Sequence, residues 1–252
     1  MNAIHEELPQ ESMVYVGDQF HVPYGPRPLE EIRAFSEEIS GFLILQNVKL
    51  IVVACNTASA AALKYLRQKF PHIPFVGMEP AVKPAAELTK SGVVGVLATQ
   101  STLQGALYAS VLERFAGDVS VMQDACPGLV DQIERGELEA HKTEIILRDA
   151  LLPMIAKGAD TIVLGCTHYP FVIPLIKKIT GADVRVIDPA PAVARQVKRV
   201  LQEYALFSEE PPPASMEYFT TGDPVLMQTS LKSLLGLDGF VKGIQWRDEK
   251  LG

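Results

Sequence analysis

The chain has 252 residues, 48% hydrophobic and 21% charged, which is an ordinary globular balance with length for one large domain or two modest ones. The net charge of −7 argues against a nucleic-acid partner held mainly by phosphate contacts. No apolar run approaches the roughly 20 residues of a membrane span, and residues 1–10 do not resemble a signal peptide. Three cysteines are too few for a disulfide framework, so we expect a cytoplasmic protein.

Short apolar strands alternate with helices along the chain. The expected strands cover residues 13–16, 50–54, 73–77, 92–98, 119–122, 161–165 and 184–188, and a last strand with its turn covers residues 216–223. Residues 1–12 are expected to be the end of a helix. Further helices are expected over 29–46, 58–70, 139–157, 174–178, 190–204 and 225–235. Three more are expected to open at 78–80, to contain Tyr108 and to begin over 128–135. Residues 209–213 are expected to be a polar, extended connector. This alternation predicts an α/β fold with mainly parallel sheets flanked by helices.

Two strands end in cysteine, and the two segments echo each other. Leu50-Ile-Val-Val-Ala-Cys55 is followed by Asn56-Thr57, and Thr161-Ile-Val-Leu-Gly-Cys166 is followed by Thr167-His168. Open α/β folds bind ligands at the carboxyl ends of parallel strands, so both thiols are expected to face a ligand. Two thiols on opposite sides of one ligand suit a reaction that inverts a carbon centre. Backbone amides at each strand-to-helix junction are expected to lower the thiol pKa and so supply a thiolate.

The echo also predicts how the chain is divided. We expect two related lobes, the first built from residues 1–79 and 189–252 and the second from residues 80–188, with the active site in the cleft between them.

Other interpretations of the cysteines remain. A buried cysteine most often packs as a small apolar side chain, and this is the interpretation we give to Cys126, which lies between Ala125 and Pro127. A zinc site is disfavoured because the chain has no C-x-x-C or H-x-x-x-H spacing. Hydrolysis by a Cys-His-Asp triad needs one thiol and one base, and it leaves the second matched cysteine unexplained.

Four further features have both a functional and a structural interpretation. His168 is either a catalytic partner of Cys166 or a hydrogen-bonded junction residue. Glu134 is either a site residue or a solvated helix charge. The hydroxyl-rich segment Thr99–Thr102 either binds an anion or caps a helix. Asp18, at the end of the first strand, either orients a thiol or stabilises the turn.

The motifs around these residues resemble those of a known family. Val53-Ala-Cys-Asn-Thr-Ala-Ser59 and Leu164-Gly-Cys-Thr-His-Tyr-Pro170 resemble the two cysteine motifs of glutamate racemases, in the aspartate/glutamate racemase superfamily. Further matches are Gly17-Asp18, Val22-Pro-Tyr-Gly-Pro26, Thr99 and Thr102 with Tyr108, Ala125-Cys-Pro127 and Thr220-Thr-Gly-Asp223. The resemblance covers essentially the whole chain. It implies cofactor-independent racemisation of L- and D-glutamate between two α/β lobes, supplying D-glutamate for peptidoglycan.

The resemblance also implies roles for individual residues. Cys55 and Cys166 would be the two acid/base thiols, with His168 assisting Cys166 and Glu134 assisting the chemistry. The residues that would bind the substrate are Pro23, Tyr24, Gly25, Asn56, Thr57, Thr99, Thr102, Thr167 and His168. No cofactor and no metal are expected.

Some positions depart from the family pattern. The family opens with a strand ending in Asp-Ser-Gly, whereas here Met1 falls inside the expected first helix, so we expect a shortened opening. Gln19 and His21 stand where the family usually has Thr and Arg, and Gly105 stands where Ser is common.

The sequence therefore predicts a glutamate racemase whose partner is a small-molecule substrate, with no nucleic acid and no membrane. An apolar lobe surface would also support a homodimer. The nearest alternative is a racemase of another acidic amino acid such as aspartate. An alternative of another class is a truncated, catalytically impaired paralogue that binds glutamate or a protein partner.

Overall fold

The structure is a computed structural model that describes residues 1–209, 214–247 and 250–252, and it divides into two compact units. The first unit comprises Met1–Val53, Ala61–Gly77 and Ala190–Gly252, and the second comprises Ala54–Ala60 and Met78–Pro189. The short segment that contains Cys55 thus belongs to the second unit, whereas it was expected in the first lobe. Most of the expected connector at 209–213 lies outside the described residues.

The second unit is built on a four-stranded parallel sheet with the strand order β5-β4-β6-β7. Its strands are β4 (Val93–Ala98), β5 (Ser120–Asp124), β6 (Thr161–Gly165) and β7 (Arg185–Ile187). Its helices are α4 (Val82–Leu88), α5 (Gln100–Gln104), α6 (Ala106–Phe115), α7 (Leu129–Glu134), α8 (His141–Ala156), the 3₁₀ helix η1 (Tyr169–Val172) and α9 (Ile173–Thr180). Because the sheet is parallel, all four strands end at the same edge.

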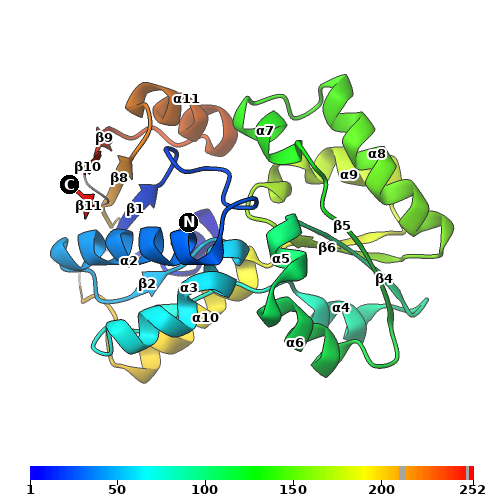
Figure 1. The fold of residues 1–252 in the computed structure, drawn as a ribbon, viewed down its shortest axis with the longest axis horizontal. Helices are drawn as coiled ribbons and strands as arrows, with labels where there is room; N and C mark the ends of the chain where they lie inside the picture. Colours follow the sequence, from blue (N-terminus) through cyan, green and yellow to red (C-terminus); the bar gives the residue numbers. More distant parts are fainter. Residues whose placement is uncertain (210–213, 248–249) are drawn as a thin grey trace. The chain divides into compact units, whose positions relative to one another are not determined.

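Helices cover both faces of this sheet, as Figure 1 shows. Successive side chains of a strand point to opposite faces, so Val96 packs with the helices on one side and Leu97 with those on the other. Ile162 and Val163 divide in the same way on β6. The strands are therefore apolar on both faces, which explains why they appear in the sequence as continuous apolar runs.

The described residues of the first unit form three small sheets. β1 (Met13–Gly17), β8 (Met216–Thr220) and β9 (Val241–Gly243) are parallel in the order β1-β8-β9. β2 (Ile51–Val52) pairs in parallel with β3 (Phe75–Val76), and β10 (Trp246–Arg247) pairs antiparallel with β11 (Lys250–Leu251). The helices of this unit are α1 (Asn2–Glu7), α2 (Leu29–Leu45), α10 (Ala190–Glu203), α11 (Pro224–Leu235) and most of α3 (Asn56–Lys69), whose first turn belongs to the second unit.

The β2–β3 pair and the β1-β8-β9 sheet each pack in an apolar cluster. Leu66 of α3 packs with Ile51 and Phe75 of the β2–β3 pair. Met227 and Leu231 of α11 pack against β8 and β9. These clusters hold the strand ends, and therefore the loops that follow them, in fixed positions.

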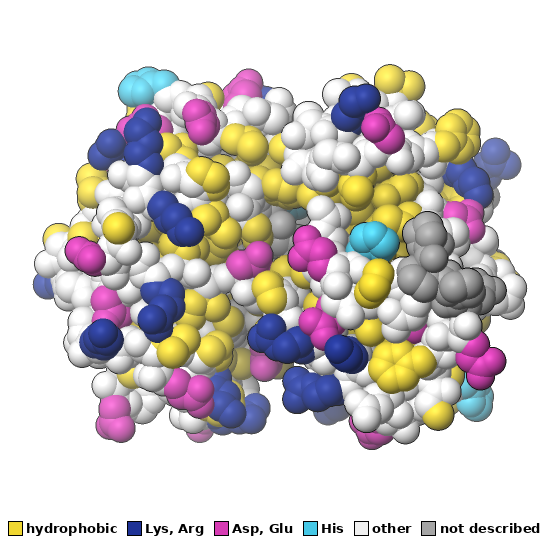
Figure 2. Space-filling model, turned by 180° about the vertical axis from the view of Figure 1, so that it is seen from behind, with side chains coloured by type: hydrophobic (Ala, Val, Ile, Leu, Met, Phe, Trp, Pro, Cys, Tyr) yellow, Lys and Arg dark blue, Asp and Glu magenta, His cyan; other side chains and the backbone are white. Residues whose placement is uncertain are grey.

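The prediction of an α/β fold with mainly parallel sheets is confirmed, since only the β10–β11 pair is antiparallel among the described residues. The strands β9, β10 and β11 were not predicted. No helix in the described part of the chain is long and apolar enough to cross a membrane. On the face drawn in Figure 2, acidic and basic side chains are both spread among apolar ones.

Candidate active site

Cys55 lies immediately before α3, at the amino end of the helix. The Ala58 N–H donates a hydrogen bond to Cys55 Sγ at 3.5 Å, and the Ser59 N–H donates to the Cys55 carbonyl at 2.8 Å. The sulfur therefore takes the position that a serine or aspartate oxygen takes as a helix N-cap. This geometry follows from a cysteine placed directly between strand and helix.

The electrostatics of Cys55 correct one expectation from the sequence. Burial raises the pKa of the Cys55 thiol, and the Ala58 N–H and the Thr57 amide and hydroxyl, which lower it, do not offset that effect. The charge of Cys166 raises the pKa of Cys55 further. The prediction that amides would lower this pKa overall is thus wrong, because desolvation outweighs them. A thiolate at Cys166 favours the protonated thiol at Cys55, as one acid and one base require.

Cys166 follows β6 and is 8% exposed. Its Sγ lies 3.8 Å from His168 Nδ1, and His168 Nε2 lies 2.5 Å from Glu134 Oε1. The three groups form a chain from thiol to imidazole to carboxylate. This is the arrangement in which an imidazole exchanges protons with a thiol while a carboxylate fixes the orientation of the ring.

The proton affinity of His168 follows from its two neighbours. Burial lowers the pKa of His168, but the hydrogen bonds to Cys166 and Glu134 outweigh burial and raise that pKa to about 10. The hydrogen bond from His168 lowers the pKa of Glu134, with burial opposing. At neutral pH the pair is therefore an imidazolium and a carboxylate, and Cys166 has a cationic neighbour.

Three threonine hydroxyls meet near the start of α3. Thr57 Oγ1 lies 3.0 Å from Thr99 Oγ1 and 3.1 Å from Thr102 Oγ1, and the last two lie 3.0 Å apart. Thr57 and Thr102 are buried. The structure thus brings together three of the residues predicted to bind substrate, one of which precedes β4 in the chain while the other two follow it.

Asn56 stands beside Cys55 in the first turn of α3. It is 3% exposed, and neither its Nδ2 nor its Oδ1 has a hydrogen-bond partner. A buried amide without a partner costs free energy, so such a group marks a place where a ligand or water completes the site. Thr167, directly after Cys166, is partly buried.

The third cysteine, Cys126, packs among apolar side chains, and the described side chains form no cluster that suits a metal ion. Cys126 is buried in the apolar core of the second unit, where burial raises the pKa of its thiol, so the structure agrees with a packing role. Within residues 1–209, 214–247 and 250–252, no three His, Cys, Asp or Glu side chains come together as metal ligands.

The predicted residues Pro23, Tyr24 and Gly25 lie in the first unit, on the loop between β1 and α2. The Tyr24 hydroxyl donates a hydrogen bond to Asp18 Oδ2 at 2.6 Å. Asp18 therefore stabilises this loop, the second of its two interpretations from the sequence.

Sequence reasoning missed two partners of Asp18. The Thr221 hydroxyl donates to Asp18 Oδ1 at 2.8 Å, and the Trp246 indole N–H donates to the same oxygen at 3.0 Å. Thr221 lies in a segment that resembles the family, but its partner is more than 200 positions upstream and no local pattern links the two. Trp246 is the chain's single tryptophan, and this was the one feature of the sequence that could have drawn attention to it as a partner.

The fold and these contacts define a class: an α/β protein with one thiol at the start of a helix and a second thiol, after a parallel strand, joined to an imidazole and a carboxylate. The sequence pattern of the Asp/Glu/Hydantoin racemases matches residues 1–197. A curated glutamate racemase of Ectopseudomonas mendocina is 48% identical over 236 residues, which are 94% of this chain and 89% of the relative.

Solved structures agree with this match. Glutamate racemase isoform RacE1 from Bacillus anthracis has a TM-score of 0.85 at 33% identity, covering 99% of this chain and 92% of that one. Escherichia coli glutamate racemase in complex with L-glutamate and the activator UDP-MurNAc-ala has a TM-score of 0.81 at 28% identity, covering 96% and 93%. The chain belongs to the Asp/Glu/Hydantoin racemase family.

Proposed function

We propose that this protein is a glutamate racemase, an isomerase that interconverts L- and D-glutamate with Cys55 and Cys166 as its two acid/base groups. The observation that carries the proposal is the chain from the Cys166 thiol to the His168 imidazole to the Glu134 carboxylate, with Sγ 3.8 Å from Nδ1 and Nε2 2.5 Å from Oε1, in a unit whose other candidate thiol, Cys55, lies at the start of α3. A two-base racemase needs one thiolate and one thiol at the start of each turnover, and an imidazole held by a carboxylate equips one of these two thiols for proton exchange.

The proton balance of the reaction is simple. The thiolate takes the α-proton of glutamate, which leaves the bonding electron pair on the α-carbon. The thiol on the other side gives its proton to that carbon, so the configuration inverts. After one turnover the protonation states of the two cysteines are exchanged, and the enzyme is ready for the opposite enantiomer until solvent resets them.

The two sides of the site handle protons differently. The Cys55 sulfur is supported by helix amides, which do not carry protons. Cys166 has His168 beside it, and Glu134 keeps that imidazole charged near neutral pH. His168 thus stabilises a thiolate at Cys166 and returns a proton to it, a role for a histidine tuned by a carboxylate.

Binding of the substrate is assigned to polar groups around these thiols. Asn56, with a buried and unpartnered amide, is suited to a substrate carboxylate or ammonium group. The hydroxyls of Thr57, Thr99 and Thr102 each have one hydrogen to donate, so donation to a carboxylate replaces one of their mutual hydrogen bonds. For Thr167 and the Pro23–Gly25 loop, the support is the resemblance alone.

Glutamate is preferred to aspartate because the relative and the two solved structures described above are glutamate racemases, and one of them holds L-glutamate. The experiment is turnover of L-glutamate, D-glutamate and L-aspartate by the purified chain, followed by loss of optical rotation. Racemisation of both glutamate enantiomers with at most weak turnover of aspartate is expected. A faster rate with aspartate would favour the alternative substrate, and an inert, well-folded chain would favour the impaired paralogue.

The cellular role follows from the product. D-Glutamate made in this way would serve peptidoglycan synthesis, as the family resemblance implies. Three free cysteines, two of them needed as thiols, favour a reducing compartment, and we assign the enzyme to the cytoplasm on that ground. A homodimer is part of the proposal, and light scattering at working concentration tests it.

A further inference from the structure

The loop between β1 and α2 is organised around one buried carboxylate. Asp18 is 8% exposed, and a buried carboxylate is costly unless hydrogen-bond donors surround it. Four side chains do so. The Tyr24 hydroxyl lies 2.6 Å from Oδ2 and His21 Nδ1 lies 2.9 Å from it, while the Thr221 hydroxyl and the Trp246 indole N–H donate to Oδ1 at 2.8 and 3.0 Å.

The donors come from three separate parts of the chain. His21 and Tyr24 belong to the loop itself. Thr221 follows β8, whose pairing with β1 places Gly17 beside Thr220. Trp246 begins the β10–β11 hairpin. One carboxylate thus joins the loop, the sheet edge and the hairpin.

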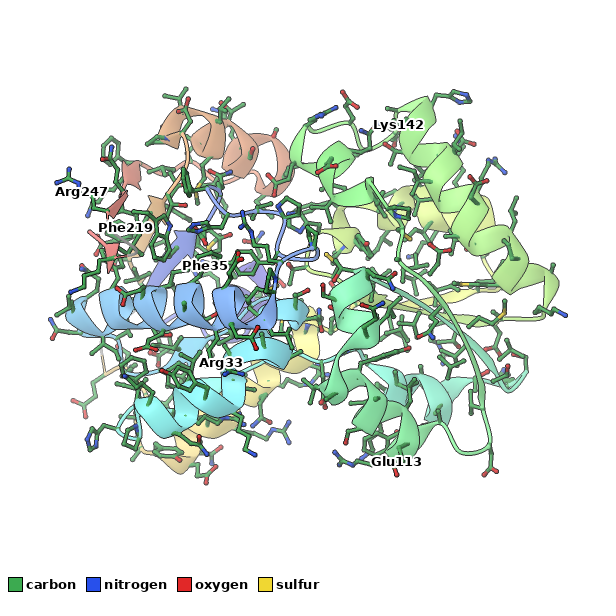
Figure 3. The ribbon with its side chains drawn as sticks, in the orientation of Figure 1. Arg33, Phe35, Glu113, Lys142, Phe219 and Arg247 are labelled. Atoms are coloured by element: carbon green, nitrogen blue, oxygen red, sulfur yellow. The ribbon has the colours of Figure 1, made fainter. Side chains whose placement is uncertain are left out.

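Aromatic packing supports the same arrangement. The His21 ring stacks on Phe35 of α2, with centroids 3.7 Å apart and planes at 9°, and it also makes edge-on contacts with Trp246 at 4.8 Å and with Phe20 at 4.9 Å. Phe35 is labelled on α2 in Figure 3. Arg27 lies over the same Phe35 ring at 5.6 Å and its Nε donates to the His21 carbonyl. Packing from several sides restricts the loop to one conformation.

Two of the positions that depart from the family pattern, Gln19 and His21, lie in this part of the first unit. His21 is a direct neighbour of Asp18, and the Gln19 Oε1 accepts a hydrogen bond from the Thr220 hydroxyl at 2.7 Å. The departures are therefore integrated into the loop rather than left as unsupported surface residues.

We propose that Asp18, Thr221 and Trp246 are positioning residues that hold the Pro23–Gly25 loop in its substrate-binding conformation. This inference rests on the proposed function, in which that loop binds glutamate. A loop that is ordered before the ligand arrives does not lose that entropy on binding. Loosening the loop should therefore weaken the affinity for glutamate, seen in the KM and the Kd, and leave the rate of the proton transfers unchanged.

The test uses Thr221→Val, which removes the donor to Asp18 at nearly constant volume, and Thr221→Ser, which keeps it. The valine also removes an acceptor for the Phe20 N–H, and the serine restores that as well. We expect Thr221→Val to raise the KM and the Kd for glutamate about tenfold, the effect of losing a hydrogen bond to a charged group, with kcat within about twofold of wild type. Thr221→Ser should stay close to wild type in all three.

A second variant keeps the test decisive if Thr221→Val fails to fold. Trp246→Phe removes the indole N–H but keeps a ring against His21, and the same rise in KM with preserved kcat is expected. For the Thr221 variants, fluorescence of Trp246, the single tryptophan, reports whether the hairpin stays packed. Lys242→Ala serves as control, because it breaks an exposed pair with Glu217 elsewhere on the same sheet.

The outcomes separate this inference from the proposed function. A wild-type chain that racemises glutamate, with unchanged KM and Kd in folded Thr221→Val and Trp246→Phe, would overturn the positioning role alone. A fall in kcat at unchanged KM would also overturn it. A wild-type chain that binds glutamate without racemising it contradicts the function, and the Kd comparison still decides the positioning role. A chain that does neither overturns both.

Discussion

Asp160 connects a surface turn to the strand that carries Cys166, and its removal gives a sharp test of how that strand is held. Its Oδ1 accepts the Thr89 and Thr161 hydroxyls at 2.6 and 3.0 Å, and its Oδ2 accepts the Lys90 and Ser91 N–H groups at 2.7 and 2.9 Å. Partial burial raises the pKa of Asp160, but these hydrogen bonds lower it from 3.8 to about 2.

The magnitude follows from linkage. A folded-state pKa of about 2 against 3.8 in the unfolded chain corresponds to at most about 2.5 kcal/mol of stability. The carboxylate is partly exposed, so solvent screening reduces this, and we expect about 1 kcal/mol. Because the folded pKa is the lower one, the contribution is complete above pH 3.8 and is lost as the pH falls toward 2.

Asp160→Asn should therefore lower the free energy of unfolding by about 1 kcal/mol at pH 7, and by about half as much at pH 3. Urea unfolding followed by circular dichroism measures both. Asp149→Asn, at an exposed position on α8 of the same unit, is the matched control and should change neither value. An equal loss at both pH values, or none at pH 7, would refute the reasoning.

Three further predictions concern the site and the core. Glu134→Gln removes one of the two groups that hold the pKa of His168 near 10, so the alkaline limb of the pH profile of kcat/KM should move to lower pH. An unmoved alkaline limb would contradict the proposed proton exchange between Cys166 and His168. Leu147→Ala, at a fully buried position, should lower the unfolding free energy by about 2–5 kcal/mol in urea titration, and a loss below about 1 kcal/mol would contradict its core position. Gly95→Ala on β4 would put Cβ 2.6 Å from both Ile162 Cδ1 and Met154 Sδ, so a loss of about 1–3 kcal/mol of stability is expected in the same titration. A neutral result would show that both side chains move aside without cost.

The sequence predicted most elements because local patterns determine them. The buried strands β4 and β6 have apolar residues on both faces, and that composition is visible without any partner. The helix after Cys55 was expected from Ala58, whereas it begins at Asn56, because the cysteine itself caps it. The two-residue strands such as β10 have no period long enough to detect.

The site was predicted only in part, for a physical reason. Side chains next to the cysteines were singled out because a strand end predicts its neighbours, whereas the role of Glu134 came from the family resemblance. The structure places Glu134 Oε1 2.5 Å from His168 Nε2, a contact that no local pattern predicts. The net pKa of Cys55 could not be predicted, because burial depends on the whole unit. The cluster around Asp18 depends on Thr221 and Trp246, which only the folded chain brings there.

The central claim is that two thiols share one racemisation, and deuterium incorporation tests it most directly. L-Glutamate is incubated with the enzyme in deuterated water, samples are quenched at early times, the two enantiomers are separated by chiral chromatography, and NMR then reads the α-position of the remaining L-glutamate and of the D-glutamate formed. Two bases predict D-glutamate that carries deuterium and L-glutamate that still carries protium, because the proton removed goes to one sulfur and the other sulfur delivers deuterium. Cys55→Ala and Cys166→Ala should each abolish racemisation. D-Glutamate that retains the original proton, or racemisation that survives loss of either thiol, would contradict the account.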